Sequence, residues 1–299
     1  MSGIDAEQAR NVIQAQFPTV RPGRVQWLGE GYDSTAFDVD NVWVFRFPKR
    51  RDVERQLLME MRLLPLLASD SPLPVPLYRF NGMPSRLFPR HFGGYRKLAG
   101  VPAIGLDADP VRDRLAPKLA SFLSHLHAFP LGHAADQGIP RLGRDSAIVE
   151  ARTEALEDIG TVARVAPDLI ADAWIEALAE APASGNEPYV SDNLVHGDLA
   201  AEHFMYDSAT ASLCGVIDWS DVAIGDPAVD LAGVFHWGGA RLLDAVLSSY
   251  RGAVDDATLA RARYLAACRG IADVRFGIET DRAEYVAAGV RALDFSAAR

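Results

Sequence analysis

The N-terminal part of the chain contains short apolar runs separated by turn residues, a pattern typical of paired β-strands. Residues 25–28, 36–39 and 42–47 form three such runs. Asp40 and Asn41 lie between the second and third runs, and both residue types favour a tight turn. We therefore expect a strand-rich segment near the N-terminus.

Beyond residue 50, apolar residues recur mostly at three- and four-residue steps, which is the period of an amphipathic α-helix. One helix of this kind is expected earlier, at residues 1–17, and another at residues 53–64, ended by prolines at residues 72–76. Residues 94–98 predict a further strand. Six more helices are expected at residues 111–128, 145–159, 165–181, 227–250, 256–276 and 281–295.

The order of these elements predicts an α+β protein with two lobes. With 299 residues, the chain is long enough to form two packed cores. We expect a small β-rich N-lobe at residues 1–98 and a larger helical C-lobe at residues 99–299, with a hinge at residues 99–102. A cleft between two lobes is the usual place for a small-molecule site.

Composition and charge exclude several classes of function. The apolar share of 49% and the charged share of 23% are those of an ordinary globular protein. The net charge of -10 argues against a nucleic-acid-binding surface, which needs a basic footprint. The sequence has neither a membrane-spanning apolar run nor a signal peptide, so we expect a cytoplasmic protein. Cys214 and Cys268 lack metal-ligand spacing and are expected to be free thiols.

Two aspartates in apolar surroundings are the most informative chemical feature of the chain. Asp198 stands just after Leu194 and Val195, and Asp218 ends the apolar run 213–217. A carboxylate in such a place needs a cation or hydrogen-bond donors to replace its lost water. Phosphoryl transfer uses such a pair, because one carboxylate takes the hydroxyl proton and another holds Mg²⁺. A single aspartate would more often cap a helix or turn, but two together favour catalysis.

Candidate phosphate-binding residues occur in the expected N-lobe. Gly29 and Gly31 lie between two strands and could let backbone amides approach phosphates, although a β-turn without ligand fits them equally well. Arg46 and Glu60 could form an ion pair that organises phosphates, or each could be an ordinary surface residue. Lys49 is an alternative phosphate ligand.

Several other patterns favour structural roles or exclude an activity. Asp226 precedes a proline in the manner of a helix N-cap, and Asp230 on that helix could brace the catalytic segment. His125 and His127 are two residues apart, so on a helix they face different directions and share no metal. The chain has no His-Glu-x-x-His and no Gly-x-Ser-x-Gly pattern, which argues against zinc and serine hydrolases.

Together these residues resemble the signature of antibiotic phosphotransferases with the protein-kinase-like fold. The catalytic segment carries this resemblance at residues 196–199, His203, residues 217–219 and residues 225–230. Similarity to aminoglycoside 2''-phosphotransferases lies in residues 29–33, 45–49, 73–76 and 94–102. Similarity to macrolide 2'-phosphotransferases lies in residues 50–53, 216–220 and 284–285. The resemblance spans nearly the whole chain and implies a bilobal, protein-kinase-like α+β fold.

The resemblance assigns roles in the catalytic centre. Asp198 would be the catalytic base that accepts the hydroxyl proton. His203 occupies the position, five residues after the base, where most kinases place an asparagine that binds magnesium. Asp218 matches the metal-binding aspartate of the kinase Asp-Phe-Gly motif. The expected metal is therefore Mg²⁺, held by His203 and Asp218.

The resemblance also implies where the nucleotide binds. Glu60 matches a helix glutamate that pairs with a strand lysine, but Arg46 holds the lysine position, so Arg46 and Lys49 remain alternatives for phosphate contact. Tyr95 sits where a bulky side chain can obstruct adenine, so GTP is considered beside ATP. The other nucleotide-binding candidates are Gly29, Gly31 and Ser34, with Arg96 and Leu98 through their main-chain groups.

The acceptor site is expected in the C-lobe. Its candidate residues are Asp221, Phe235, His236, Trp237, Asp273 and Glu279. Asp221 matches a carboxylate position of the aminoglycoside enzymes. The two aromatic residues would suit an apolar ring or a sugar face, or alternatively belong to the core. Asp273 and Glu279 could supply carboxylates for an amino group, or could form a solvated helix face.

The expected protein is a monomeric, magnesium-dependent kinase that transfers the γ-phosphoryl group of GTP or ATP to a hydroxyl of an antibiotic. An aminoglycoside is the first choice of acceptor. A macrolide 2'-phosphotransferase or a metabolite kinase on the same fold is the alternative. A nucleotide-binding module without activity is a third interpretation, supported only by Arg46 in the lysine position. No nucleic-acid or membrane partner is expected.

Overall fold

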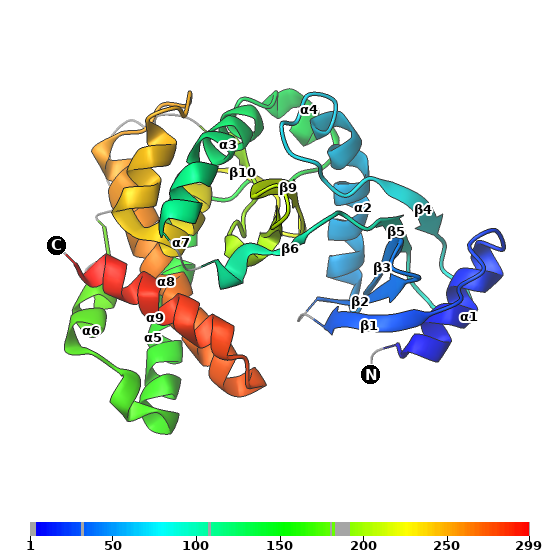
Figure 1. Cartoon of the computed structure of the whole chain (residues 1–299), viewed down its shortest axis with the longest axis horizontal. Helices are drawn as coiled ribbons and strands as arrows, with labels where there is room; N and C mark the ends of the chain where they lie inside the picture. Colours follow the sequence, from blue (N-terminus) through cyan, green and yellow to red (C-terminus); the bar gives the residue numbers. More distant parts are fainter. Residues whose placement is uncertain (1–3, 31–32, 107–108, 180, 183–191, 299) are drawn as a thin grey trace. The chain divides into compact units, whose positions relative to one another are not determined.

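The structure is a computed structural model that describes residues 4–30, 33–106, 109–179, 181–182 and 192–298. The chain divides into two units, which Figure 1 shows with most of their elements labelled. Residues 1–99 and 215–220 form the N-terminal unit, and residues 100–214 and 221–299 form the C-terminal unit. The first unit contains an antiparallel sheet and the second is mostly helical, so the predicted α+β class is confirmed.

The N-terminal unit is built on a five-stranded antiparallel sheet with the strand order β1-β2-β3-β5-β4. The strands are β1 (Val25–Glu30), β2 (Ser34–Val39), β3 (Trp43–Pro48), β4 (Tyr78–Gly82) and β5 (Phe92–Arg96). The three strands expected in the first 50 residues are confirmed. Asp40 and Asn41 turn between β2 and β3 with φ of 57° and 56°, a backbone conformation that these residue types tolerate well. The fifth strand begins two residues earlier than predicted, and β4 was not predicted.

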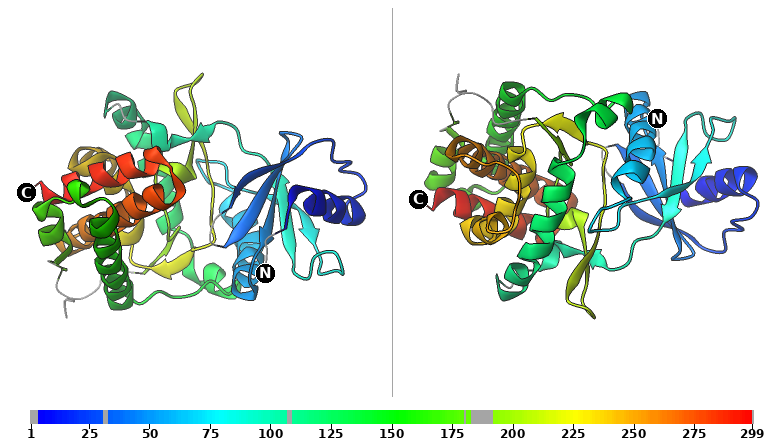
Figure 2. Two further views of the ribbon diagram at one scale, coloured as in Figure 1. Left: turned by 90° about the horizontal axis from the view of Figure 1, so that it is seen from below. Right: turned by 90° about the horizontal axis from the view of Figure 1, so that it is seen from above.

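Two helices cover the two faces of this sheet (Figure 2). Helix α1 (Ala6–Gln16) buries Val12 and Ile13 in an apolar cluster with Phe45 of β3. Helix α2 (Arg51–Leu67) places Glu60 against Arg46 of the same strand. Since neighbouring residues of a strand point to opposite faces, the α1 face of the sheet is apolar and the α2 face carries the charged pair.

The C-terminal unit is mainly helical. Its helices are α3 (Asp109–His127), α4 (Leu131–Asp136), α5 (Arg144–Val165), α6 (Asp172–Ala179), α7 (Ala228–Leu247), α8 (Asp256–Thr280) and α9 (Ala283–Ala297), with 3-10 turns η1 (Ala103–Gly105), η2 (Pro167–Leu169) and η3 (Ala201–His203). Its short strands are β6 (Val101–Pro102), β7 (Asn193–Val195), β8 (Phe204–Asp207) and β10 (Ala223–Gly225), while β9 (Ser212–Val216) runs on into the N-terminal unit. The pair β7 and β10 flanks the catalytic segment expected from the sequence.

Two of the predicted helices are interrupted. The helix expected at residues 165–181 is wrong in its first part: α5 ends at Val165, and only α6 is α-helical. Pro167 explains the break, because it pushes the preceding residue out of the helical region, and Ala166 has a φ of -146°. Helix α7 is kinked at Gly238 and Gly239, where the φ of 63° at Gly239 is one that glycine adopts without strain.

Helices α7, α8 and α9 lie side by side and form the core of the C-terminal unit (Figures 1 and 2). A cluster of apolar side chains joins α5, α6, α8 and α9, with Val162, Ile271 and Leu293 fully buried in it. Close packing in this unit also depends on glycine. A Cβ atom on Gly233 of α7 would lie 1.6 Å from the carbonyl oxygen of Leu199, so the backbones of α7 and of the catalytic segment are in direct contact.

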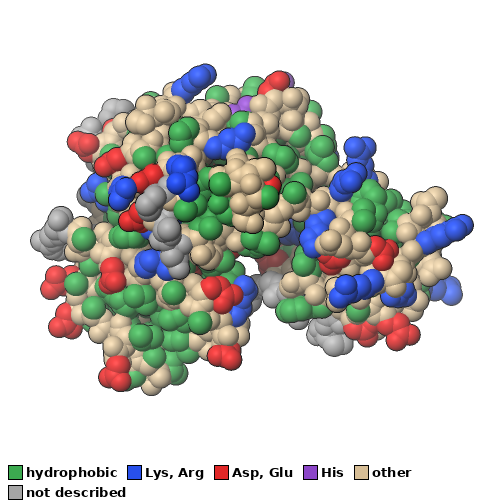
Figure 3. Space-filling view, in the orientation of Figure 1, with side chains coloured by type: hydrophobic (Ala, Val, Ile, Leu, Met, Phe, Trp, Pro, Cys, Tyr) green, Lys and Arg blue, Asp and Glu red, His purple; other side chains and the backbone are tan. Residues whose placement is uncertain are grey.

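The molecule carries surface charges of both signs and two cysteines outside any disulfide. Among the described residues, no helix is both long and apolar enough to cross a bilayer. The face drawn in Figure 3 carries acidic and basic side chains on each unit. Cys214 and Cys268 are free thiols, as expected. Burial raises the pKa of Cys268 to about 12, so this thiol stays protonated and is a poor nucleophile.

The contact between α7 and the catalytic segment predicts a large effect for Gly233→Ala. The added methyl group cannot fit without moving the backbone, so we expect a loss of about 1–3 kcal/mol or more in the free energy of unfolding. Gly160→Ala is the matched control, because a Cβ atom on Gly160 of α5 would meet no other atom within 4 Å. This variant should gain up to about 1 kcal/mol from helix propensity. Urea denaturation of both variants would test this, and equal stabilities would contradict it.

Candidate functional site

The N-terminal unit holds a buried ion-pair cluster centred on Arg46. Its Nη1 donates to both carboxylate oxygens of Glu60, at 3.2 and 3.0 Å. Its Nη2 donates to Oδ1 of Asp218 at 3.0 Å and to Oγ of Ser220 at 2.7 Å. Arg46 is only 8% exposed and Glu60 is fully buried. The ion pair that the sequence left open is therefore present, and it extends to Asp218.

The charges in this cluster hold one another in place. Burial alone would lower the pKa of Arg46. The negative charges of Glu60 and Asp218 outweigh burial and raise this pKa above its usual value, so the guanidinium stays cationic. Burial raises the pKa of Glu60, and Arg46 partly offsets that rise. Tyr78 donates a third hydrogen bond to Glu60, at 2.9 Å. The buried carboxylate is thus surrounded by donors, as its burial requires.

Asp218 is held by hydrogen bonds and is partly exposed. Its backbone has a φ of 62°, and Oδ1 accepts hydrogen bonds from Arg46 and from Ser220 Oγ at 3.1 Å. The next residue, Trp219, is fully buried and its indole donates to the carbonyl of Val216 at 3.2 Å, which anchors the turn. The side chain of Asp218 is nevertheless 46% exposed. This combination suits a carboxylate that binds an incoming cation.

The glycine-rich loop is described only in part. Gly29 lies in β1, where a Cβ atom would meet nothing within 4 Å, so packing does not demand glycine there. Gly31 lies outside the described residues. Ser34 begins β2. The amide of Lys49, just past β3, donates to the carbonyl of Asp33 at 2.9 Å, which ties the lysine to the end of this loop.

The hinge candidates differ in exposure. Tyr95 is buried edge-on against Tyr78, with ring centroids 5.2 Å apart, and burial raises its pKa. Arg96 is exposed and Leu98 partly so. Both line a cavity of about 560 Å³ together with Trp43, Pro74, Val75, Leu77 and Arg79. Since Trp43 and Arg46 point to opposite faces of β3, this cavity does not lie on the Arg46 face of the sheet.

In the C-terminal unit, Asp230 braces the catalytic segment. This carboxylate is fully buried and accepts the amide of His196 at 2.9 Å and the amide of Gly197 at 3.1 Å. His127 donates a third bond to it through Nε2 at 3.0 Å, while its Nδ1 accepts from Tyr250 at 2.6 Å. The expectation that Asp230 points back to this segment is confirmed. His127 therefore has a structural role rather than a metal-binding one.

A sharp turn presents Asp198. Gly197 has a φ of 88°, and a Cβ atom there would lie 2.0 Å from the carbonyl oxygen of Asp221. His203 Nδ1 lies 2.6 Å from the carbonyl oxygen of Asp198, which requires a proton on Nδ1 and leaves the lone pair on Nε2. The side chain of Asp198 is 37% exposed. The turn thus holds the backbone of Asp198 and leaves its carboxylate accessible.

The carboxylate of Asp198 is paired with Arg269 of α8. Arg269 Nη1 donates to Oδ1 of Asp198, and Nη2 donates to Oε1 of Glu202 at 2.6 Å. Burial works against the charge of Arg269, but Asp198 and Glu202 outweigh it and raise the pKa of Arg269. For Glu202, burial alone would raise the pKa, yet Arg269 dominates and lowers it to about 2. The guanidinium and this glutamate are therefore both charged at physiological pH.

The six expected acceptor residues divide into a buried group and an exposed group and do not gather at one surface. Phe235 and Trp237 are each 2% exposed, and Trp237 stacks on Phe204 with centroids 5.8 Å apart. His236 and Asp273 are also buried, with Nε2 and Oδ2 3.0 Å apart. Two further candidates, Asp221 and Glu279, are exposed, and Glu279 pairs with Arg275 at 2.8 Å. None of these six described residues lines the cavity beside Asp198.

That cavity has a volume of about 310 Å³ and lies within the C-terminal unit. Its polar lining consists of Asp198, Arg269, Glu154 and Asp158. Its other lining residues are Ala151, Gly197, Leu199, Val229, Ala232, Gly233, Leu265, Cys268 and Ala272. Burial, Glu150 and Asp158 raise the pKa of Glu154, which means that its negative charge is poorly compensated. The cavity therefore combines the accessible carboxylate of Asp198 with two acidic residues of α5, of which Asp158 is paired with Arg275 at 2.6 Å.

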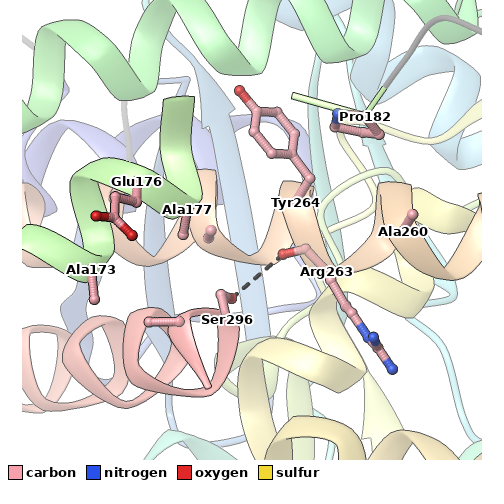
Figure 4. A pocket seen from close by; sticks show the side chains of 10 residues that line it. Ala173, Glu176, Ala177, Pro182, Ala260, Arg263, Tyr264 and Ser296 are labelled. Atoms are coloured by element: carbon pink, nitrogen blue, oxygen red, sulfur yellow. Dashed lines mark hydrogen bonds between the residues drawn. The ribbon is translucent and has the colours of Figure 1, made fainter. Parts of the chain in front are cut away.

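A second cavity, of about 280 Å³, lies between α6, α8 and α9 (Figure 4). Arg263 and Tyr264 of α8 line it, and the hydroxyl of Ser296 donates to the carbonyl of Arg263 at 3.5 Å. Most of its other lining residues are alanines. Asp198 and Arg269 do not line it. Elsewhere among the described residues, no three His, Cys, Asp or Glu side chains are arranged to hold a metal ion by themselves.

Sequence reasoning missed Arg269, Glu202, Tyr78 and Ser220. A signal for Arg269 was present, since it interrupts a run of small and apolar residues from Leu265 to Ala272. A charge in such a run needs a buried counter-ion. The identity of that counter-ion could not be found from spacing, because Asp198 is 71 residues away.

The buried Arg46 cluster predicts the effect of removing one partner. Arg46→Met leaves Glu60 buried without its cation, so we expect a loss of about 3–5 kcal/mol in the free energy of unfolding. The double variant Arg46→Met/Glu60→Gln removes the uncompensated charge and keeps the acceptor for Tyr78, so it should recover most of that loss. Urea denaturation would measure both. A double variant no more stable than the single one would contradict this account.

The lowered pKa of Glu202 predicts a specific acid sensitivity. A carboxylate with a pKa of about 2 in the folded state and about 4.5 in the unfolded state contributes about 3 kcal/mol to the free energy of unfolding at pH values above 4.5. This contribution is lost as the pH falls from about 4.5 towards 2. The stability gap between wild type and Glu202→Gln should therefore narrow over this interval, as far as both proteins remain folded. A gap independent of pH would refute the assignment.

Comparisons with known proteins show the family of this chain. The model of the phosphotransferase enzyme family, APH, matches residues 24–265. Viomycin phosphotransferase of Streptomyces vinaceus is 31% identical over 158 residues, which cover 52% of this chain and about half (54%) of that relative. The resemblance noted from the sequence is confirmed at the level of the family.

Solved structures extend the comparison to the whole chain. The GDP complex of aminoglycoside 2'-phosphotransferase-IIIa is 29% identical, with a TM-score of 0.75 and coverage of 99% of both chains. Macrolide 2'-phosphotransferase type I is 24% identical, with a TM-score of 0.63 and coverage of 98% of this chain and 99% of that one, and shows the shared fold. This chain belongs to the phosphotransferase enzyme family and is a phosphotransferase that acts on an alcohol group.

Proposed function

We propose that this protein phosphorylates a hydroxyl group of an amino-bearing antibiotic, an aminoglycoside in the first instance, with GTP as the phosphoryl donor. One observation supports this most directly. Asp198, on a turn braced by Asp230, opens into a cavity whose wall carries Glu154 and Asp158. A carboxylate beside an acidic wall suits an acceptor that brings both a hydroxyl and ammonium groups.

In the proposed reaction Asp198 is the catalytic base. The acceptor oxygen forms a bond to the γ-phosphorus while the bond from that phosphorus to the leaving nucleoside diphosphate breaks. The proton of the hydroxyl passes to the carboxylate of Asp198. Because the transition state needs little covalent help, orienting the hydroxyl supplies most of the rate enhancement. Asp230 serves this step by fixing the backbone that carries Asp198.

Within the N-terminal unit, we propose that Lys49 supplies positive charge to the nucleotide phosphates and that Arg46 orders the site. Both terminal nitrogens of Arg46 already donate to Glu60, Asp218 and Ser220. Lys49 is tied to the end of the glycine-rich loop, next to which phosphates are expected. Gly29 and Ser34 would border the same phosphates.

Two features support GTP rather than ATP. Tyr95 occupies the position where a bulky residue can obstruct adenine, and its burial against Tyr78 fixes its ring. The structure with 29% identity is a GDP complex. Main-chain groups of Arg96 and Leu98 are proposed to read the edge of the base. ATP remains the alternative co-substrate.

We propose Mg²⁺ as the metal and Asp218 as a ligand in the N-terminal unit; His203, in the C-terminal unit, is a separate candidate ligand. The side chain of Asp218 is half exposed and carboxylate oxygen is the ligand type that Mg²⁺ prefers. His203 fits a metal through Nε2, because Nδ1 is committed to the carbonyl of Asp198. A bound Mg²⁺ would neutralise charge on the phosphates. Asp218 is held ready for it by Arg46 and Ser220.

The residues proposed to contact the acceptor include two acids of α5 that the sequence did not suggest, Glu154 and Asp158. Phe235 and Trp237 belong to the core, so an apolar wall for a macrolide ring loses its support. Glu154 and Asp158 on α5 replace them as the proposed wall for an amino-bearing acceptor. Macrolide phosphorylation is the alternative on the same fold, and a metabolite alcohol would be a third acceptor. Asp221 and Glu279 are exposed and remain proposed outer contacts.

Replacing Asp198 tests the proposed function. Asp198→Asn should lower the rate of transfer by about 100-fold to 10,000-fold, since it removes the base but keeps the shape of the side chain. The Michaelis constant for GTP should stay the same. The measurement is mass spectrometry of kanamycin, gentamicin, erythromycin and viomycin incubated with enzyme, Mg²⁺ and GTP or ATP, scored for the gain of one phosphoryl group.

Asp244→Asn is the matched control, because Asp244 is an exposed aspartate on α7. It should transfer phosphate at the wild-type rate. Transfer to erythromycin alone would favour the macrolide alternative. Nucleotide hydrolysis without any product would indicate another alcohol, and no turnover of nucleotide at all would favour a binding module. Wild-type rates in Asp198→Asn would remove this residue from the mechanism.

A further inference from the structure

Arg269 contacts the proposed base from a distant part of the chain. Asp198 lies on the turn after β7, and Arg269 lies in the middle of α8. The planar guanidinium uses one terminal nitrogen for Asp198 and the other for Glu202. A rigid fork that donates to two carboxylates fixes the position of both more closely than a single point charge would.

This fork distinguishes the two oxygens of Asp198. Oδ1 accepts from Arg269, whereas Oδ2 lies 3.8 Å from Nδ1 of His203. At 3.8 Å this is no hydrogen bond. Oδ2 is therefore the oxygen that can accept a proton from a substrate. Arg269 also lines the cavity next to Asp198, so its charge faces the same space as the base.

The charge of Arg269 affects which part of an acceptor can approach. Because the guanidinium is paired with Asp198, it offsets the attraction of that carboxylate for an ammonium group but leaves an uncharged hydroxyl unaffected. Glu154 lines the same cavity from α5, and its negative charge lies close to those of Glu150 and Asp158. An acceptor with both kinds of group would therefore direct its hydroxyl to Asp198 and its ammonium groups to α5.

We propose that Arg269 is a positioning residue for phosphoryl transfer, which holds one oxygen of Asp198 and steers the acceptor so that a hydroxyl, rather than an ammonium group, meets the other oxygen. This inference rests on the proposed role of Asp198 as the base. Glu202 sets the orientation of the Arg269 guanidinium because it accepts a hydrogen bond from the second terminal nitrogen.

The test compares Arg269→Gln with wild type in steady-state kinetics, using GTP, Mg²⁺ and the acceptor that wild type phosphorylates. The expected result is a kcat lowered by about 10-fold to 100-fold, the usual effect of a slightly misplaced catalytic group. The KM for a cationic acceptor should stay the same or fall, because a repulsive charge has been removed. A loss of kcat together with unchanged or tighter acceptor binding would not result from a merely structural role of Arg269.

Two controls make the test decisive. Arg263→Ala removes another arginine of α8, one that lines the separate cavity of Figure 4, and should keep the wild-type kcat. Arg269→Lys keeps the charge but not the fork, so it should restore the KM of wild type and only part of its kcat. A kcat within about twofold of wild type in Arg269→Gln would overturn the proposal.

The failure of this inference can be told apart from the failure of the proposed function. If Asp198→Asn transfers phosphate normally, the proposed base is wrong, and the role of Arg269 with it. If Asp198→Asn is inactive but Arg269→Gln is not impaired, only the role of Arg269 is wrong. Should Arg269→Gln fail to fold, Glu202→Gln releases one nitrogen of the fork. It should lower kcat several-fold without raising the acceptor KM, and an unchanged kcat would overturn the proposal.

Discussion

The catalytic turn depends on one buried carboxylate, Asp230. Burying such a group without partners would cost several kcal/mol, and three donors from two other segments remove that cost. Two of the donors are backbone amides of the catalytic segment, at 2.9 and 3.1 Å. The third is His127, which is itself held by Tyr250. Moving the turn would break the pairing of a fully buried charge, so the place of Asp198 is fixed by the core of its unit.

The carboxylates proposed to act in the reaction follow the same rule, each held by a partner from a different element. Asp218 is held by Arg46 of β3, which is neutralised in turn by Glu60 of α2. Asp198 is held by Arg269 of α8, whose other nitrogen goes to Glu202. In both cases a guanidinium bridges two carboxylates, one buried and one accessible. The buried partner fixes the arginine, and the arginine then orients the accessible carboxylate without covering it.

This arrangement explains what the sequence could and could not predict. Periodicity located β1, β2 and β3 and most helices, because each buries one face, and the apolar setting of Asp198 and Asp218 marked them as unusual. It missed β4, whose large apolar residues are only Tyr78 and Phe80, and it overlooked the effect of a proline on the start of α6. The partners of the charges were out of reach, since side chains 71 or 172 residues apart meet only through tertiary packing.

The first half of α7 shows why its aromatic residues do not line the cavity beside Asp198. Residues 231–239 are apolar or small on nearly all sides of the helix, a composition typical of a fully buried helix rather than of a cavity wall. Their aromatic rings therefore pack inward, and α7 lines the cavity with Val229, Ala232 and Gly233. These short side chains let the cavity extend up to the turn of Asp198, so the charged side chains that line it come from that turn, from α5 and from α8.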